Sequence, residues 1–184
     1  MRVWRSTGRA RVTVHDLQMI VDPGPTWQLE GRWIWRLGVH PRMTLFLWRV
    51  AWGILPTKGI LAGRGIPIPA DCEGCPGKEE TISHVLFMCP RALQVWGLVL
   101  THRLTFTSTE IFLSQLRDSA RIFDTMDRAT VWAYVAYHIW LDRNARIFEG
   151  RGFYPRSVVG RALAHAAELA SAAADITPGD DRDI

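Results

Sequence analysis

A chain of 184 residues is long enough for one domain, or for a small domain with a helical extension, and it can bury a sizeable core. Apolar residues make up 48% of it and charged residues 22%, a balance that excludes the disordered class. No apolar run reaches the about 18 residues that cross a bilayer, and no secretory signal core follows the N-terminus. We therefore expect neither a membrane protein nor a secreted one.

The positive charge is concentrated in the first third of the chain. Residues 1–64 carry ten basic and three acidic side chains, whereas residues 65–91 sum to −2 and residues 92–184 to −1. This asymmetry favours an anionic partner. Twenty of the 22 basic residues are arginine, whose planar fork suits phosphate, although arginine-rich codon usage explains that count equally well. Four arginines without an acid in the first fifteen residues also faintly resemble a mitochondrial presequence.

The first expected elements lie on either side of residue 40. A proline-rich stretch at residues 22–25 breaks any regular element, and the aromatic, basic stretch 26–37 is interpreted as a linker into the body of the domain. Pro41 suits the first turn of a helix that runs through residues 44–52 and ends at Gly53. This is the first helix that the sequence predicts.

Its apolar side is marked by three large residues. Leu45, Trp48 and Trp52 share one face of the cylinder. Thr57 then suits the cap of a second, short helix that Gly63 stops. Tryptophans such as these are expected to be core anchors first, and platforms for base stacking only as a second interpretation.

Turn-forming residues dominate the next segment. Residues 66–80 hold three prolines and three further turn-forming residues, Asp71, Gly74 and Gly77, which predicts a loop or a tight hairpin. Thr81 suits the cap of one helical turn over residues 82–88, and Pro90 suits the start of a helix over residues 92–100.

The remainder of the chain is predicted to be helical. The expected helices run from Ser108 or Thr109 to Arg117, from Asp124 or Asp127 to Asn144, and over residues 156–174. The predicted fold is therefore mainly α, with a small hairpin or loop embedded among short helices and a helical C-terminal extension.

The strongest chemical signal is the clustering of all three cysteines with one histidine. Cys72, Cys75, His84 and Cys89 follow the pattern C-x2-C-x8-H-x4-C within 18 residues. Zinc prefers four tetrahedral nitrogen and thiolate ligands, and two cysteines separated by two residues reach one ion from a tight turn. We therefore predict one structural zinc ion in a zinc-knuckle-like hairpin.

Local features of the sequence support this convergence. Gly74 and Gly77 offer the backbone freedom that a turn at the first two cysteines needs. On an ideal helix His84 and Cys89 would point about 140° away from each other, so the helix must end between them. Pro90 disfavours helical geometry at Cys89 and supplies that break.

Other interpretations of the cluster remain. The cysteines and the histidine are ordinary core residues in one, and Cys72 and Cys75 form a redox pair in another, although such a pair wants a strand-helix context that the sequence lacks. With four protein ligands no water remains for activation, so a closed zinc site is structural and not catalytic. The other five histidines lack neighbouring ligands and are expected at the surface or in the core.

These residues resemble a known family, the zinc-binding domain found downstream of the polymerase in plant non-LTR (LINE-type) retrotransposon reverse transcriptases. The similarity covers about residues 27–100 and consists of residues 33–42 (WIWRLGVHPR), 46–49 (FLWR), 55–57 (LPT), Leu61, Arg64, Cys72, Cys75, 80–81 (ET), 84–87 (HVLF), Cys89 and Trp96. Further on, Ile139, Trp140, Arg143, Asn144 and Phe148 resemble the helical segment that leads towards a ribonuclease H-like domain.

The resemblance implies an organisation and a location for the chain. A basic, poorly ordered segment 1–26 precedes the zinc-binding domain 27–102, and a helical extension 103–176 and a disordered tail 177–184 follow it. The family's zinc ligands fall on the cysteines and the histidine named above. Neither a Tyr-x-Asp-Asp polymerase signature nor a ribonuclease H-like domain is found, so a non-enzymatic fragment or decayed descendant is expected, in a reducing nuclear or cytoplasmic compartment.

Two functions follow from these observations. In the first, the chain is a non-catalytic nucleic-acid-binding module, and Arg42, Arg49, Lys58 and Arg64 contact the phosphates of template RNA or target DNA with weak sequence selectivity. In the second, it is a zinc-stabilised scaffold or protein-interaction domain whose arginines form a solvated face. An enzyme is disfavoured, because two-metal chemistry requires several converging carboxylates.

Overall fold

The computed structural model describes residues 26–37, 39–100, 105–119 and 128–174. The expected tail 177–184 lies outside these residues, as do the expected segment 1–26 apart from Thr26 and the caps expected at Asp124 and Asp127. The elements are, in chain order, the 3-10 helix η1 (Thr26–Arg36), α2 (Pro41–Ala51), α3 (Lys58–Gly63), β1 (Asp71–Cys72), β2 (Cys75–Glu79), the π-helical turn η2 (His84–Met88), α4 (Pro90–Trp96), α5 (Thr109–Ser119), α6 (Arg128–Glu149) and α7 (Pro155–Ala174). The prediction of a mainly α fold with one small hairpin is confirmed.

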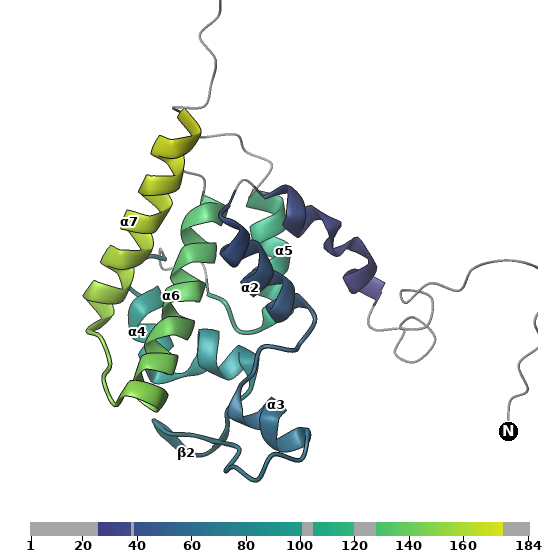
Figure 1. Cartoon of the computed structure of the whole chain (residues 1–184), viewed down its shortest axis with the longest axis vertical. Helices are drawn as coiled ribbons and strands as arrows, with labels where there is room; N and C mark the ends of the chain where they lie inside the picture. Colours follow the sequence, from purple (N-terminus) through teal and green to yellow (C-terminus); the bar gives the residue numbers. More distant parts are fainter. Residues whose placement is uncertain (1–25, 38, 101–104, 120–127, 175–184) are drawn as a thin grey trace, which may run out of the picture.

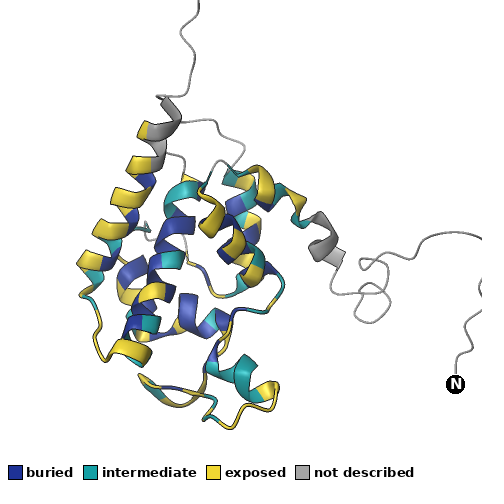
Figure 2. Cartoon of the chain, in the orientation of Figure 1, coloured by how far each residue is buried: buried dark blue, intermediate teal, exposed yellow. Residues whose placement is uncertain are grey.

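Helix α6 runs through the middle of the fold, and the other long helices pack around it. It contacts α7 on one side and α2 and α5 on the other, and η2 and α4 also pack against it (Figure 1). Buried residues therefore occupy most of its circumference, as Figure 2 shows by colour. The hairpin and α3 extend from the lower end of the molecule in this view. Within the described residues, none of the helices combines the length and apolar character needed to span a membrane.

Aromatic rings form the centre of the core. Phe106 lies between Trp96, Phe112 and Trp132, with ring centroids 4.9, 5.2 and 5.3 Å away in edge-to-face arrangements. Such pairs stabilise a core by about 0.5–1.5 kcal/mol each beyond the area that they bury. The expectation that tryptophans anchor the core is confirmed for Trp96 and Trp132, and also for Trp140.

Helix α2 buries a different face from the apolar one named in the sequence. Met43, Phe46 and Val50 are at most 4% exposed, whereas Leu45 is 40% exposed. The expectation for Leu45 was wrong because α2 is packed by η1, α5 and α6 together, and their combined surface covers the opposite arc. The rings of Trp48 and Trp52, 5.7 Å apart, are only half-buried.

Three element boundaries also differ from the expectations. Residues 26–36 form the 3-10 helix η1 instead of a linker, and its Ile34 is buried in the core next to α2. Helix α4 ends at Trp96, where tighter turns take over up to residue 100. Helix α6 continues past Asn144 to Glu149, because the left-handed residue that ends it is Gly150, at φ 64°.

Candidate metal centre

The hairpin places the first two cysteines next to each other. β1 and β2 are antiparallel, with Cys72 paired to Cys75 across a turn of two residues. Gly77 adopts φ 73°, a left-handed conformation that suits glycine, but Gly74 does not lie in that region. The backbone freedom expected at both glycines is therefore needed only at Gly77.

The other two members of the cluster lie at the ends of η2. Thr81 Oγ1 accepts a hydrogen bond from the His84 amide at 3.1 Å, which confirms the predicted cap. The Cys89 amide donates to the His84 carbonyl oxygen at 2.7 Å, the i to i+5 spacing of a π-helix. Cys89 itself is extended, at φ −61° and ψ 134°, and Pro90 begins α4. The helix therefore ends between His84 and Cys89, as Pro90 predicted.

The structure brings the four side chains to one point. One donor atom from each of Cys72, Cys75, His84 and Cys89 lies within 4.8 Å of the other three. The sulfurs of Cys75 and Cys89 are 3.9 Å apart. In a tetrahedral site with zinc–sulfur bonds of about 2.3 Å, two sulfurs lie about 3.8 Å apart. The cluster therefore has the dimensions that one zinc ion requires.

The histidine of the cluster has a nitrogen with nothing to bond. Within the described residues, Nε2 of His84 is buried and has no hydrogen-bond partner. Leaving such an atom unpaired costs about 1–3 kcal/mol. Burial lowers the pKa of His84, an effect that nearby Glu80 opposes, and the neutral imidazole is the form that binds metals. A bound cation would satisfy this nitrogen.

The surroundings favour the neutral thiol form of Cys72 and Cys75 in the absence of a cation. Burial raises the pKa of Cys72 to about 11, and the charges of Cys89 and Cys75 act in the same direction, against a hydrogen bond from the Gly74 backbone. Burial and the Cys89 charge also raise the pKa of Cys75. Zinc binds the thiolate form, so a divalent cation at this cluster would displace protons from these thiols, and its affinity would fall as the pH falls.

A buried ion pair anchors the loop that joins the two halves of the cluster. Glu80 and Arg143 are 2% and 4% exposed. The Glu80 carboxylate accepts hydrogen bonds from Nε and Nη2 of Arg143 and, at 2.7 Å, from the Lys58 amide. The guanidinium also lies 4.8 Å from the Trp140 ring centre. The pair thus links the exit of the hairpin to α6 and to the start of α3.

In the sequence, Glu80 and Arg143 stand out only through the family resemblance, which assigns them no role. The two residues are 63 positions apart. No local periodicity links an acid in a loop to an arginine inside a helix. Arg143 lies in the polar run 142–144 that follows the apolar stretch of α6, so its sequence context did not mark it as buried.

The four predicted phosphate-binding residues divide into two groups. Arg42 and Arg49 are exposed, come from the same helix, α2, and line one hollow. Lys58 and Arg64 belong instead to the start and end of α3. Lys58 is half-buried and its ammonium group lies 3.3 Å from the Glu73 carboxylate, whereas Arg64 is exposed.

The site and fold are those of a small, mainly α, zinc-binding domain. Residues 18–96 match the model of a family described as zinc-binding in reverse transcriptase, which confirms the resemblance seen in the sequence. The family and the cluster together support one zinc ion as the cofactor of this chain.

The chain is also similar to a curated protein. An Arabidopsis thaliana protein that is named for ribonuclease H is 28% identical over 131 residues, which cover 68% of this chain and 21% of the relative. The chain thus spans about a fifth of the length of that relative. No solved structure matches the chain.

Proposed function

We propose that Cys72, Cys75, His84 and Cys89 bind one structural Zn²⁺ ion. The observation that carries this proposal is the buried Nε2 of His84, which has no partner in the part of the chain that the structure describes and lies in a cluster with three sulfurs. Four protein donors fill a tetrahedral shell, so no position is left for a reactive water. The ion would hold the hairpin against η2, and its binding energy would contribute to folding. Cysteines bind zinc only in their reduced form. The proposal therefore includes a reducing compartment, nuclear or cytoplasmic.

We further propose that the domain binds nucleic acid without catalysing a reaction on it. Arg42 and Arg49 are exposed on α2, and half-buried Tyr137 lies in the hollow that they line. The first 64 residues carry ten basic and three acidic side chains, which favours a polyanion. Contacts to phosphates are electrostatic, so binding would be strongly salt-dependent. They carry no sequence information, so binding would also be weakly sequence-selective.

The test is a binding titration with a labelled oligonucleotide at several salt concentrations. Arg42→Gln and Arg49→Gln should each weaken binding and reduce the salt slope by about one. Arg156→Gln is the matched control, because Arg156 is an exposed arginine on α7 away from this hollow. Binding that is absent, or insensitive to salt, would reject the proposal. Incubation of the zinc-loaded protein with Mg²⁺ and nucleic acid should leave the substrate intact.

A protein-interaction scaffold is the second candidate. Phe148 and Tyr154, 75% and 84% exposed, lie on either side of the turn between α6 and α7, and Trp35 is 58% exposed. Large apolar side chains in contact with water favour a protein partner. A folded, zinc-loaded chain that fails to bind any oligonucleotide would favour this function over the first.

A further inference from the structure

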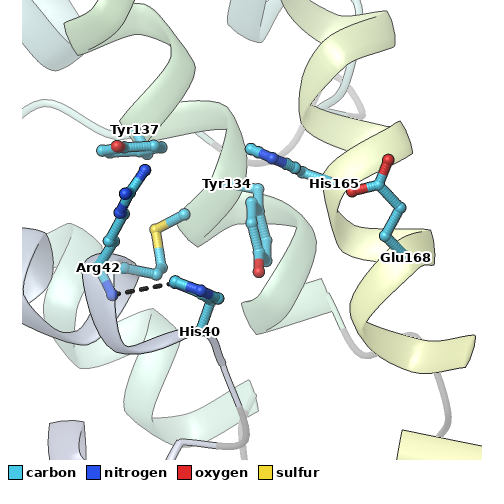
Figure 3. A pocket seen from close by; sticks show the side chains of 7 residues that line it. His40, Arg42, Tyr134, Tyr137, His165 and Glu168 are labelled. Carbon is cyan, nitrogen blue, oxygen red and sulfur yellow. Dashed lines mark hydrogen bonds between the residues drawn. The ribbon is translucent and has the colours of Figure 1, made fainter. Parts of the chain in front are cut away.

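A hollow of about 350 Å³ lies between the start of α2, the middle of α6 and α7. Figure 3 shows Tyr134 and Tyr137 from α6, His40 and Arg42 from the start of α2, and His165 and Glu168 from α7 converging on it. We call it the first hollow. Its volume is near the lower limit of small-ligand pockets, about 300–1,000 Å³, so it suits a group the size of one nucleoside and excludes a duplex.

A second hollow of about 230 Å³ adjoins the first along α2 and α6. Arg42 and Tyr137 line both hollows, so these two side chains form the wall between them. Arg49, Leu45 and Trp140 also line the second hollow. Together the two hollows form a short groove, and Arg42 and Tyr137 form the partition between its two halves.

The partition has the chemistry of a stacking platform. The Arg42 side chain points towards the Tyr137 ring (Figure 3). Tyr137 is held in place by its edge-to-face contact with Phe46, whose ring centre is 5.3 Å away, yet Tyr137 stays half-exposed. Guanidinium planes and aromatic rings are the groups on which unpaired bases stack, and such stacking tolerates any base.

Polar groups in the first hollow match the edge of a base better than a phosphate. The Arg42 amide donates to Nδ1 of His40 at 3.2 Å, so in the neutral ring the proton sits on Nε2 and is free to donate. Glu168 is exposed and borders the same hollow. A carboxylate can accept hydrogen bonds from base amino groups, and its charge repels phosphate.

The two arginines along the hollows suit the phosphates of a nucleic-acid strand. Arg42 and Arg49 are seven residues apart on α2, which separates them by about 10 Å along the helix axis. Both are exposed, and among the described residues no acidic side chain lines the second hollow. A phosphate therefore finds favourable potential along α2, while the carboxylate of Glu168 disfavours it in the first hollow.

We propose that the two hollows hold two successive bases of an unpaired strand, with Tyr137 and Arg42 stacked between them. This inference rests on the proposed nucleic-acid binding and narrows its ligand to single-stranded nucleic acid. A paired base is stacked within its duplex and does not enter either hollow, so duplex binding is limited to phosphate contacts with the arginines.

Fluorescence anisotropy with the full, zinc-loaded chain tests this. The probes are a labelled twelve-nucleotide RNA, the same RNA as a blunt duplex, and a single-stranded DNA of the same sequence. The single strands should bind about tenfold or more tightly than the duplex. Tyr137→Leu fills a similar space without a ring and should weaken single-strand binding about tenfold, with little change in duplex binding or salt slope.

Two further variants separate stacking from packing. Tyr137→Phe keeps the ring and should retain the affinity of the unmodified chain. Tyr154→Leu removes an exposed tyrosine that is outside both hollows and should change nothing. Circular dichroism and zinc content establish that each variant is folded.

The possible failures are distinguishable. Equal, salt-dependent affinity for single strand and duplex would overturn the inference and leave nucleic-acid binding intact. Full single-strand affinity in Tyr137→Leu would overturn it in the same way. Absence of binding to all three probes would overturn both proposals.

Discussion

Replacing Arg143 by methionine would leave the Glu80 carboxylate buried without its cation. Glu80 is 2% exposed, and the Lys58 amide at 2.7 Å would be its one remaining partner among the hydrogen bonds described above. Removing one member of a buried ion pair costs about 3–5 kcal/mol, whereas the methionine retains part of the packing on Trp140. We therefore expect the free energy of unfolding to fall by about 4 kcal/mol, a large share of the about 5–15 kcal/mol of an ordinary domain.

The assay is equilibrium urea unfolding of the zinc-loaded protein, followed by circular dichroism. Arg151→Met is the matched control, because Arg151 pairs with Glu149 at the surface, where the side chains are 71% and 50% exposed, and its loss should cost about 0–1 kcal/mol. Adding Glu80→Gln to Arg143→Met removes the stranded charge and should recover much of the loss. A cost below about 1 kcal/mol for Arg143→Met alone would refute this account of the pair.

Two further predictions concern local stability. Thr57 is fully buried and its hydroxyl accepts a hydrogen bond from the Ile60 amide at 3.4 Å, so Thr57→Ala should cost about 1 kcal/mol in the same unfolding assay, and Thr57→Ser should cost less. Burial, together with His165 and Arg161, lowers the pKa of His138 from 6.5 to about 4. As the pH falls below 6.5, His138 takes up a proton in the unfolded chain but not yet in the folded chain, which favours unfolding. The stability that the neutral, buried His138 provides is therefore complete above pH 6.5 and is lost as the pH falls towards 4. Between pH 7 and 5, the free energy of unfolding of His138→Phe should fall by about 1–2 kcal/mol less than that of the unmodified chain. This figure allows for solvent near the exposed His165. The same pH dependence in both proteins would contradict this assignment.

The convergence of the four side chains was predictable from the sequence because the constraints that cause it are local. Cys72 and Cys75 are fixed by one short turn, and the break that separates His84 from Cys89 follows from the geometry of Pro90. The starts of α2, α3 and α5 were predictable for the same reason, since prolines and hydroxyl caps act within one turn of themselves.

What the sequence could not predict depends on tertiary contacts. The buried face of α2 is decided by three elements that pack on it, so the exposure of Leu45 has no local cause. The pairing of Glu80 with Arg143 and the hollows beside Tyr137 likewise depend on how α6 lies against the rest. The boundary expected near residue 102 stays a prediction, and the pair of Glu80 and Arg143 connects residues on both sides of it.

The most direct test of the proposed site is the zinc content of the natively purified protein, measured by elemental mass spectrometry beside that of Cys89→Ser. We predict about one zinc ion per chain, a marked loss of zinc in Cys89→Ser, and loss of helical signal when a chelator removes the metal. A well-folded preparation that contains no metal and keeps its circular dichroism spectrum in the presence of chelator would contradict the proposal that Cys72, Cys75, His84 and Cys89 form a structural zinc site.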